Sequence, residues 1–185
     1  MNVTSTCCQA FLFRLVISLV VFLVPGIPSL YRGLFLIYVS DFLDGIFFRI
    51  NYPTEKEKLN NTYQYHLIDK VADALNNWLG LMLISSALGS VGLDVIYVAL
   101  IWRCIGIIMF TQIKSSYVWL LFPDLTKELL LCRYVFGELT PKIFTVVAIL
   151  KVGYEYYHHF INNQRDFDQS TNLIDGQMWS LYKTR

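Results

Sequence analysis

The chain has little cysteine, and its cysteines have no informative spacing. Only four occur among 185 residues: Cys7 and Cys8 are adjacent, whereas Cys104 and Cys132 stand alone inside apolar stretches. A zinc site needs pairs of ligands at short, regular intervals, and a disulfide framework needs a regular set of cysteines. Neither is indicated, and buried, unreactive thiols are expected.

Charge is also scarce, and neither sign dominates. Charged residues make up 16% of the chain, with 15 Lys and Arg against 14 Asp and Glu, and no basic block occurs. Proteins whose main partner is nucleic acid usually concentrate positive charge in one segment or on one surface. A nucleic acid partner is therefore not expected.

Apolar residues are abundant: 55% of the chain is hydrophobic and 16% is aromatic. This is too much for one soluble core of this length, but it is enough for several membrane spans of about 20 residues each. Six apolar stretches joined by short connections predict an all-α, polytopic membrane bundle of six transmembrane helices, at residues 9–25, 30–49, 69–88, 93–112, 117–136 and 140–161. This membrane domain would occupy residues 1–162, and residues 163–185 would form a polar cytosolic tail.

The fifth stretch is the least regular of the six. It contains Pro123, Asp124, Lys127, Glu128 and Arg133. Proline ends or kinks a helix, and charged side chains avoid contact with lipid. This stretch is therefore either kinked and turned inward or partly outside the membrane.

The distribution of basic residues predicts the orientation of the bundle. The connection between the second and third stretches carries Arg49, Lys56, Lys58 and Lys70, the next connection carries none, and the one after carries Lys114. Under the positive-inside rule, the connection after the second stretch lies in the cytosol, as do both termini. Lys70 itself is expected to be an interfacial lysine that extends its side chain towards water.

Four aspartates lie at that same connection. Asp41 and Asp44 end the second stretch, and Asp69 and Asp73 begin the third. Residues three or four apart share one helix face, so each pair places two carboxylates side by side, and antiparallel neighbouring helices bring the pairs together. Four facing carboxylates repel each other unless a cation neutralises them, and hard oxygen ligands favour Mg²⁺ or Mn²⁺. The sequence therefore predicts a divalent metal site.

Two neighbours of the first pair refine this prediction. Gly45 follows Asp44 directly and permits close approach of a ligand to the helix backbone. Arg49 lies five residues after Asp44, and its planar guanidinium suits phosphate oxygens. Carboxylates, metal ions and an arginine together suggest a diphosphate substrate.

At these residues the chain resembles the CDP-alcohol phosphatidyltransferase family, whose signature is D-x-x-D-G-x-x-A-R followed by G-x-x-x-D-x-x-x-D. Asp41, Asp44, Gly45 and Arg49 match the first half, and Asp69 and Asp73 match the paired aspartates of the second. Arg14 and Arg103 also resemble arginines of the first and fourth spans in bacterial members that use glycerol phosphate. The likeness covers most of residues 10–110.

The chain departs from the signature at two positions and in one length. Phe48 stands where the family has alanine, and Tyr65 stands where it has the second glycine. The stretch between Arg49 and Asp69 is also longer than usual and carries a hydrophilic insert at 50–62. Two bulky side chains beside the nucleotide pocket leave a second interpretation open, a non-catalytic membrane scaffold that keeps the fold.

The resemblance implies a mechanism and a role for each site residue. Two divalent metal ions, held by Asp41, Asp44, Asp69 and Asp73, grip the diphosphate of a CDP-linked lipid such as CDP-diacylglycerol. Asp41, Gly45 and Arg49 contact the CDP diphosphate. Asp73 removes a proton from a small polar alcohol of the glycerol 3-phosphate or inositol type, and CMP leaves. The implied setting is the lipid bilayer, in phospholipid biosynthesis, with the active site facing the cytosol, and the family often forms homodimers.

The acceptor alcohol would need cations in the later spans. Arg103, Lys127 and Lys151 are the candidate acceptor-binding residues. Their alternative role is internal pairing, Lys127 with Asp124 and Lys151 with Glu155, at helical spacing. A third class of protein, an ion-conducting bundle, would spread its carboxylates along a pore, whereas these aspartates cluster at one junction.

Overall fold

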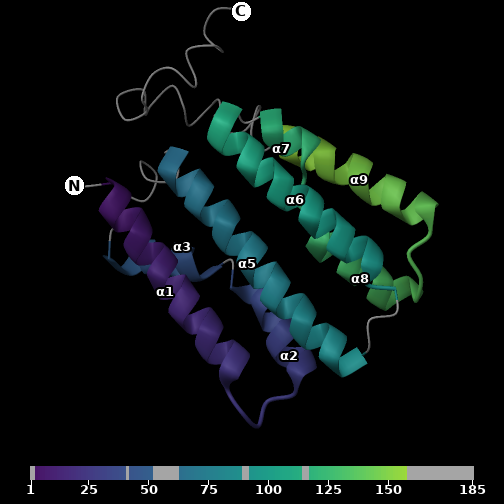
Figure 1. The fold of residues 1–185 in the computed structure, drawn as a ribbon, viewed down its shortest axis with the longest axis horizontal. Coiled ribbons are helices and arrows are strands. Elements are labelled where there is room, and N and C mark those ends of the chain that lie inside the picture. The colour runs from purple at the N-terminus through teal and green to yellow at the C-terminus, as the bar shows by residue number, and fades with distance from the viewer. Residues whose placement is uncertain (1–2, 41, 52–62, 89–91, 114–116, 158–185) are drawn as a thin grey trace, which may run out of the picture.

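The computed structural model describes residues 3–40, 42–51, 63–88, 92–113 and 117–157, and every regular element within these ranges is a helix (Figure 1). The elements, in order, are α1 Val3–Leu23, α2 Ser29–Leu34, the π-helix η1 Phe35–Val39, α3 Phe42–Asn51, α5 Tyr63–Leu88, α6 Asp94–Ile113, α7 Tyr117–Leu121, α8 Thr126–Phe136 and α9 Pro141–Tyr156. The all-helical prediction is confirmed for this part of the chain. The polar tail at 163–185 lies outside the described residues.

Three helices are long and apolar enough to cross a membrane. The qualifying segments are Ser5–Leu23 in α1, Tyr65–Leu88 in α5 and Asp94–Ile113 in α6. They correspond to the first, third and fourth predicted stretches, but α1 and α5 each begin six residues before the predicted start. Three such helices favour a membrane protein. The other three predicted spans are shorter or divided, so the arrangement with six spans stays a prediction.

The second predicted stretch, 30–49, is divided near its middle. α2 continues into η1, and Ser40 then separates η1 from α3. Figure 1 shows α3 lying across α1 instead of continuing the line of α2. The hydropathy of this stretch is continuous, so its division could not be read from the apolar pattern alone.

The fifth predicted stretch, 117–136, is broken as its proline suggested. α7 ends at Leu121, α8 begins at Thr126, and both Pro123 and Asp124 are buried in the connection between them. This arrangement favours the inward-turned alternative. The break also frees backbone groups that a continuous helix would have paired, and Asp124 Oδ1 accepts a hydrogen bond from Thr126 N at 3.1 Å.

Glycine and proline lie in or directly beside the connections after α1 and α8. Gly26, in the connection after α1, and Gly137, after α8, have φ angles of 84° and 79°, a conformation that other residues rarely adopt. Gly137 N donates to Arg133 O at 3.0 Å and ends α8. Thr140 Oγ1 then accepts from Ile143 N at 3.3 Å, and Pro141 occupies the first turn of α9.

α5 lies between the two halves of the bundle and contacts α1 and α2 on one side and α6 on the other (Figure 1). Its contact with α2 is close at two glycines. A Cβ added to Gly33 would lie 2.7 Å from the carbonyl oxygen of Gly80, and a Cβ added to Gly80 would lie 2.5 Å from Ile37 Cγ1. The two backbones approach directly, which only small residues permit.

Replacing Gly80 with alanine is therefore expected to destabilise the protein by about 1–3 kcal/mol, because the new methyl group overlaps Ile37 and α2. Alanine stabilises a helix by about 1 kcal/mol relative to glycine, so a net loss of stability in the variant would be due to the steric clash. Unfolding in detergent micelles measures the effect. Gly153→Ala on α9 is the matched control, since a Cβ there meets nothing within 4 Å. Equal stability of the two variants would contradict the close α2–α5 contact.

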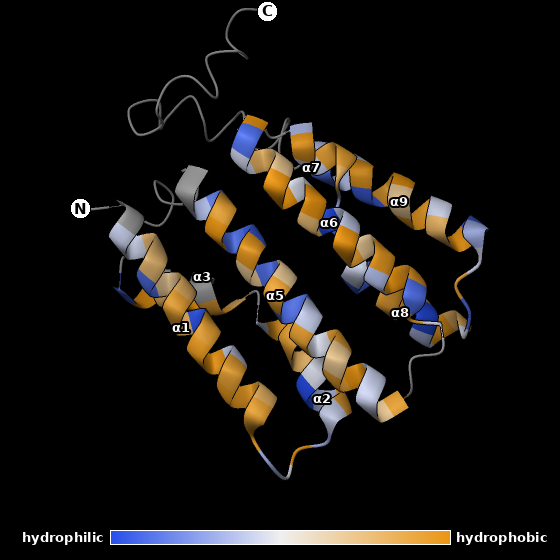
Figure 2. Ribbon diagram, in the orientation of Figure 1, coloured by the Kyte–Doolittle hydropathy of each residue, from blue (hydrophilic) through white to orange (hydrophobic). Residues whose placement is uncertain are grey.

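One face of α6 is apolar and exposed. Val98, Ile101, Ile105 and Ile108 follow each other at intervals of three and four residues, and all four are exposed. Figure 2 shows hydrophobic colour along most of α6 and α1, whereas polar segments interrupt α5. A continuous apolar stripe of this kind is unfavourable in water and suits contact with lipid.

Candidate functional site

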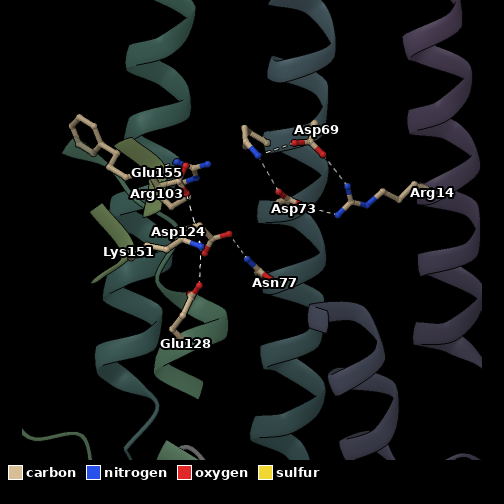
Figure 3. A network of polar contacts seen from close by, with 11 residues as sticks. Arg14, Asp69, Asp73, Asn77, Arg103, Asp124, Glu128, Lys151 and Glu155 are labelled. Carbon is tan, nitrogen blue, oxygen red and sulfur yellow. Dashed lines mark hydrogen bonds and ion pairs between the residues drawn. The ribbon is translucent and has the colours of Figure 1, made fainter. Parts of the chain in front are cut away.

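Asp69 and Asp73 lie on one face of α5 and meet an arginine from α1. Arg14 NH1 is 3.4 Å from Asp69 Oδ1, and Arg14 NH2 is 2.5 Å from Asp73 Oδ1 (Figure 3). The Arg14 side chain is 2% exposed, so this contact is inside the bundle. Because α5 begins at Tyr63, the two aspartates lie in its second and third turns and not at its first residue.

Lys70 completes this group. Its Nζ lies 2.8 Å from Asp69 Oδ2 and 3.7 Å from Asp73 Oδ2. The expectation of an interfacial lysine directed to water is therefore wrong, because the Lys70 side chain folds back on the two carboxylates of its own helix. Two cations and two carboxylates balance in charge, which is the condition under which such groups are tolerated inside a bundle. We call these four residues the carboxylate cluster.

Asp69 and Asp73 supply carboxylate oxygens, the ligand type that hard cations prefer. The Oδ1 atoms of Asp69 and Asp73 contact different nitrogens of the same Arg14 guanidinium, so the two carboxylates face the same side of α5. Among the residues that the structure describes, no group of three or more His, Cys, Asp or Glu side chains gathers as a metal site. Asp69 and Asp73 are the two members of the predicted four-carboxylate set whose side chains the structure describes, and their role as metal ligands stays a prediction.

The other two predicted carboxylates, Asp41 and Asp44, have side chains that lie outside the described part of the chain. Asp41 lies outside the described residues. The backbone of α3 includes Asp44, Gly45, Phe48 and Arg49, but their side chains lie outside the described part of the chain. The prediction that these residues hold metal and diphosphate is therefore neither confirmed nor contradicted.

α3 is held against the start of α1 by aromatic packing. The rings of Phe47 and Phe13 are 5.4 Å apart, and Phe47 and Tyr65 both pack against buried Cys7 and Ala10. Tyr65, which stands where the resembling family has glycine, precedes Asp69 by one helical turn. Its side chain thus fills space between α5 and α1, next to the carboxylate cluster.

The polar face of α5 continues for another turn. Asn76 Nδ2 donates to Ser40 Oγ at 2.8 Å, and Asn77 Nδ2 donates to Asp124 Oδ2 at 3.1 Å. Sequence reasoning missed both asparagines, although a signal was present: they follow Asp73 by three and four residues, at helical spacing, within an apolar stretch. α5 therefore has polar contacts to α1, to the end of η1 and to the α7–α8 connection.

A second polar group lies on the other side of α5, among α6 to α9 (Figure 3). Arg103 is 1% exposed; it donates from NH1 to Phe122 O at 2.6 Å, and its guanidinium carbon lies 4.3 Å from the centre of the Trp119 ring. Its buried Nε has no hydrogen-bond partner among the described residues. A buried guanidinium with so few donors used has capacity for an anion.

The other two predicted acceptor residues are engaged in different ways. Lys151 Nζ lies 2.7 Å from Glu128 and 3.9 Å from Glu155. The expected pairing at four residues is present, and the shorter pairing with Glu128, 23 residues away, was missed. Lys127 precedes Glu128 on α8, and its carbonyl oxygen accepts from Tyr38 OH at 2.7 Å.

The arrangement thus offers two chemically distinct polar groups around one helix, a carboxylate cluster towards α1 and an arginine with a paired lysine among α6 to α9. Comparison of the chain with protein-family models, curated proteins and solved structures finds no match.

Proposed function

We propose that the chain is a metal-dependent enzyme of the CDP-alcohol phosphatidyltransferase type, which transfers a phosphatidyl group from a CDP-linked lipid to a small polar alcohol and releases CMP. One observation carries the proposal. Asp69 and Asp73, the paired aspartates of the second half of the signature, contact the buried guanidinium of Arg14, and they lie on α5, which is long enough to span a membrane. Ionisable side chains within a membrane-spanning helix cost free energy, and they usually serve a function.

The proposed setting is a six-span membrane protein whose carboxylate cluster faces the cytosol. Three long apolar helices and the exposed stripe of α6 support a membrane location. The basic residues of the connection after α3 support the orientation, because Lys56 and Lys58 lie between α3 and α5, near the cluster in the chain.

The proposed reaction is a displacement at phosphorus. Asp73 accepts the proton of the acceptor hydroxyl, whose oxygen forms a bond to the lipid-side phosphorus. The bond from that phosphorus to the bridging oxygen breaks, and CMP leaves with this oxygen. Arg14 orients the Asp73 carboxylate through its bond to Oδ1. Mg²⁺ or Mn²⁺ at Asp41, Asp44, Asp69 and Asp73 would supply charge stabilisation for the diphosphate.

For the acceptor we propose Arg103 as the main contact. Lys151 is already offset by Glu128 and Glu155. The Arg103 guanidinium contacts the Phe122 carbonyl and the Trp119 ring, and its buried Nε has no hydrogen-bond partner among the described residues. An anionic acceptor such as glycerol 3-phosphate would satisfy this guanidinium, and the hydroxyls of inositol would do so more weakly.

Arg103→Lys is expected to raise the KM for glycerol 3-phosphate by about ten- to a hundredfold with a smaller change in kcat, because a charge-assisted hydrogen bond contributes about 1.5–3 kcal/mol. Lysine keeps the charge and loses the planar fork. Arg32→Lys is the matched control, since Arg32 of α2 donates to the carbonyl of Phe22, far from this group in the chain. An unchanged KM in the Arg103 variant would remove Arg103 from the acceptor site.

The decisive experiment follows CMP release. Purified full-length protein in mixed micelles is given CDP-diacylglycerol, Mg²⁺ or Mn²⁺, and glycerol 3-phosphate, inositol or another small alcohol. We expect CMP release that requires both metal and acceptor, and EDTA should abolish it. If no acceptor gives metal-dependent CMP release, the enzyme proposal is wrong.

A second candidate is a non-catalytic membrane scaffold with the same helices. The charge balance of the carboxylate cluster favours it, since Arg14 and Lys70 offset the charges of Asp69 and Asp73, and the Arg14 ion pairs link α1 to α5. This candidate predicts a negative CMP assay and a melting temperature that does not respond to Mn²⁺.

A further inference from the structure

η1 ends at a buried serine that is bonded on two sides. Ser40 N donates to Phe35 O at 3.1 Å, the wide hydrogen bond of a π-turn, and Ser40 Oγ donates to Leu36 O at 2.5 Å. π-Turns are rare and often lie next to functional residues. Beyond the junction, Leu43 N donates to Ser40 O at 3.1 Å, so the first turn of α3 is built on Ser40.

Ser40 is also bonded to α5. Asn76 Nδ2 donates to Ser40 Oγ at 2.8 Å, and both side chains are almost fully buried, at 2% and 1% exposed. Asn76 follows Asp73 by three residues and Asp69 by seven, so the three share one face of α5. A single chain of hydrogen bonds therefore runs from the aspartate face of α5, through Asn76 and Ser40, to the backbone of η1.

These hydrogen bonds connect α5 to the start of α3, and the two helices carry residues from the two halves of the signature. α5 holds Asp69 and Asp73, and α3, whose first turn is built on Ser40, includes Asp44. Phe47 holds α3 to α1 through apolar packing, which fixes direction poorly. A directional hydrogen bond between buried groups restrains the position of the α3 start relative to α5.

We propose that Asn76 and Ser40 are positioning residues of the metal site: their hydrogen bond sets where α3 starts relative to Asp69 and Asp73, and so sets the affinity for the divalent ion. The inference rests on the proposed function, because it presumes that aspartates of α3 and α5 bind one set of ions. Groups that hold metal ligands in place, without touching the metal, typically change affinity by about 10–100-fold when removed.

Asn77 provides an unusually close control. It has the same side chain, the same helix and nearly the same burial, at 1% exposed, but it bonds to Asp124 and not to η1. Loss of either amide removes one buried hydrogen bond, so Asn76→Ala and Asn77→Ala should lose similar stability, about 1–3 kcal/mol. Only the Asn76 change should affect the metal.

The test measures Mn²⁺ binding to the full-length protein in micelles by electron paramagnetic resonance. We expect wild type and Asn77→Ala to agree within about twofold, and Asn76→Ala and Ser40→Ala each to weaken binding by about tenfold or more. The double variant Asn76→Ala/Ser40→Ala should bind about as weakly as Ser40→Ala alone, because Ser40→Ala already removes the Asn76–Ser40 bond, together with the bond from Ser40 Oγ to Leu36 O.

Two results would overturn the inference while leaving the metal site in place: equal Mn²⁺ affinity in wild type and Asn76→Ala, or an equal weakening in Asn76→Ala and Asn77→Ala. Full additivity in the double variant would show two separate effects and would also overturn it. Absence of Mn²⁺ binding to the wild-type protein would instead defeat the proposed function itself, and the inference with it.

Discussion

Replacing Arg14 with methionine is expected to cost about 3–5 kcal/mol of stability, because it removes one partner of a buried ion pair. Arg14 is 2% exposed and contacts both Asp69 and Asp73. Methionine keeps much of the length and apolar volume but removes the charge. Lys70 would then be the one remaining cation described beside the two carboxylates, and their mutual repulsion would be stronger because the site is buried. Unfolding in detergent micelles with EDTA present measures this loss.

Two comparisons isolate the cause. Arg32→Met also removes a partly buried guanidinium, but one that donates to a carbonyl and a serine, so it should cost less, about 1.5–3 kcal/mol. Arg14→Met/Asp73→Asn removes both charges and should recover a large part of the loss. If Arg14→Met is no more harmful than Arg32→Met, the ion pair is not what ties α1 to α5.

The Arg14 variant also reports on the metal. If divalent ions bind Asp69 and Asp73, Mn²⁺ should raise the stability of Arg14→Met by more than it raises that of wild type, because the ion replaces the missing positive charge at the same oxygens. An equal response of the two proteins to Mn²⁺ would speak against metal binding at these two carboxylates. This readout does not depend on catalytic activity.

Asp73→Asn is expected to lower kcat for CMP release by about 10²–10⁴-fold, the contribution of a general base. The change is nearly isosteric, and the amide oxygen can still accept from Arg14, so the fold should survive. Asparagine has no basic carboxylate with which to take the hydroxyl proton. Initial rates of CMP release at saturating CDP-diacylglycerol, acceptor and metal measure the effect.

Asp94→Asn is the control for this experiment. Asp94 lies in the first turn of α6, is exposed and belongs to neither polar group, so this change should leave the rate unaltered. Retention of more than a tenth of the wild-type rate by Asp73→Asn would assign the proton transfer to another group. Circular dichroism of both variants verifies that any loss is not unfolding.

Local patterns in the sequence predicted the parts of the fold that depend on local interactions. The apolar stretches predicted most of α1, α5 and α6, although α1 and α5 each begin six residues earlier than expected, and the proline of the fifth stretch predicted its break. Helical spacing placed Asp69 and Asp73 on one face, and Lys151 with Glu155 likewise. These results follow because helical periodicity relates residues three and four apart whatever surrounds them.

Contacts between distant segments escaped this reasoning. The α3 direction depends on a π-turn and on bonds from Ser40 to α5, 36 residues away in the chain. Lys70 looked like an interfacial lysine because its helix appeared to begin at Asp69, whereas α5 starts at Tyr63 and turns Lys70 back to the carboxylates. Asn76 and Asn77 lie within an apolar stretch that was interpreted as a membrane span, so their hydrogen bonds to Ser40 and Asp124 were not predicted.

By itself the sequence determined an all-helical chain with apolar, membrane-length helices and a tandem aspartate signature, because composition and short-range periodicity suffice for these. Only the tertiary structure decided which charges meet: Arg14 with aspartates 55 and 59 residues later, and Lys151 with Glu128. Buried charges must find counter-ions, but the choice among several candidates depends on how helices pack, and this packing is a property of the whole bundle.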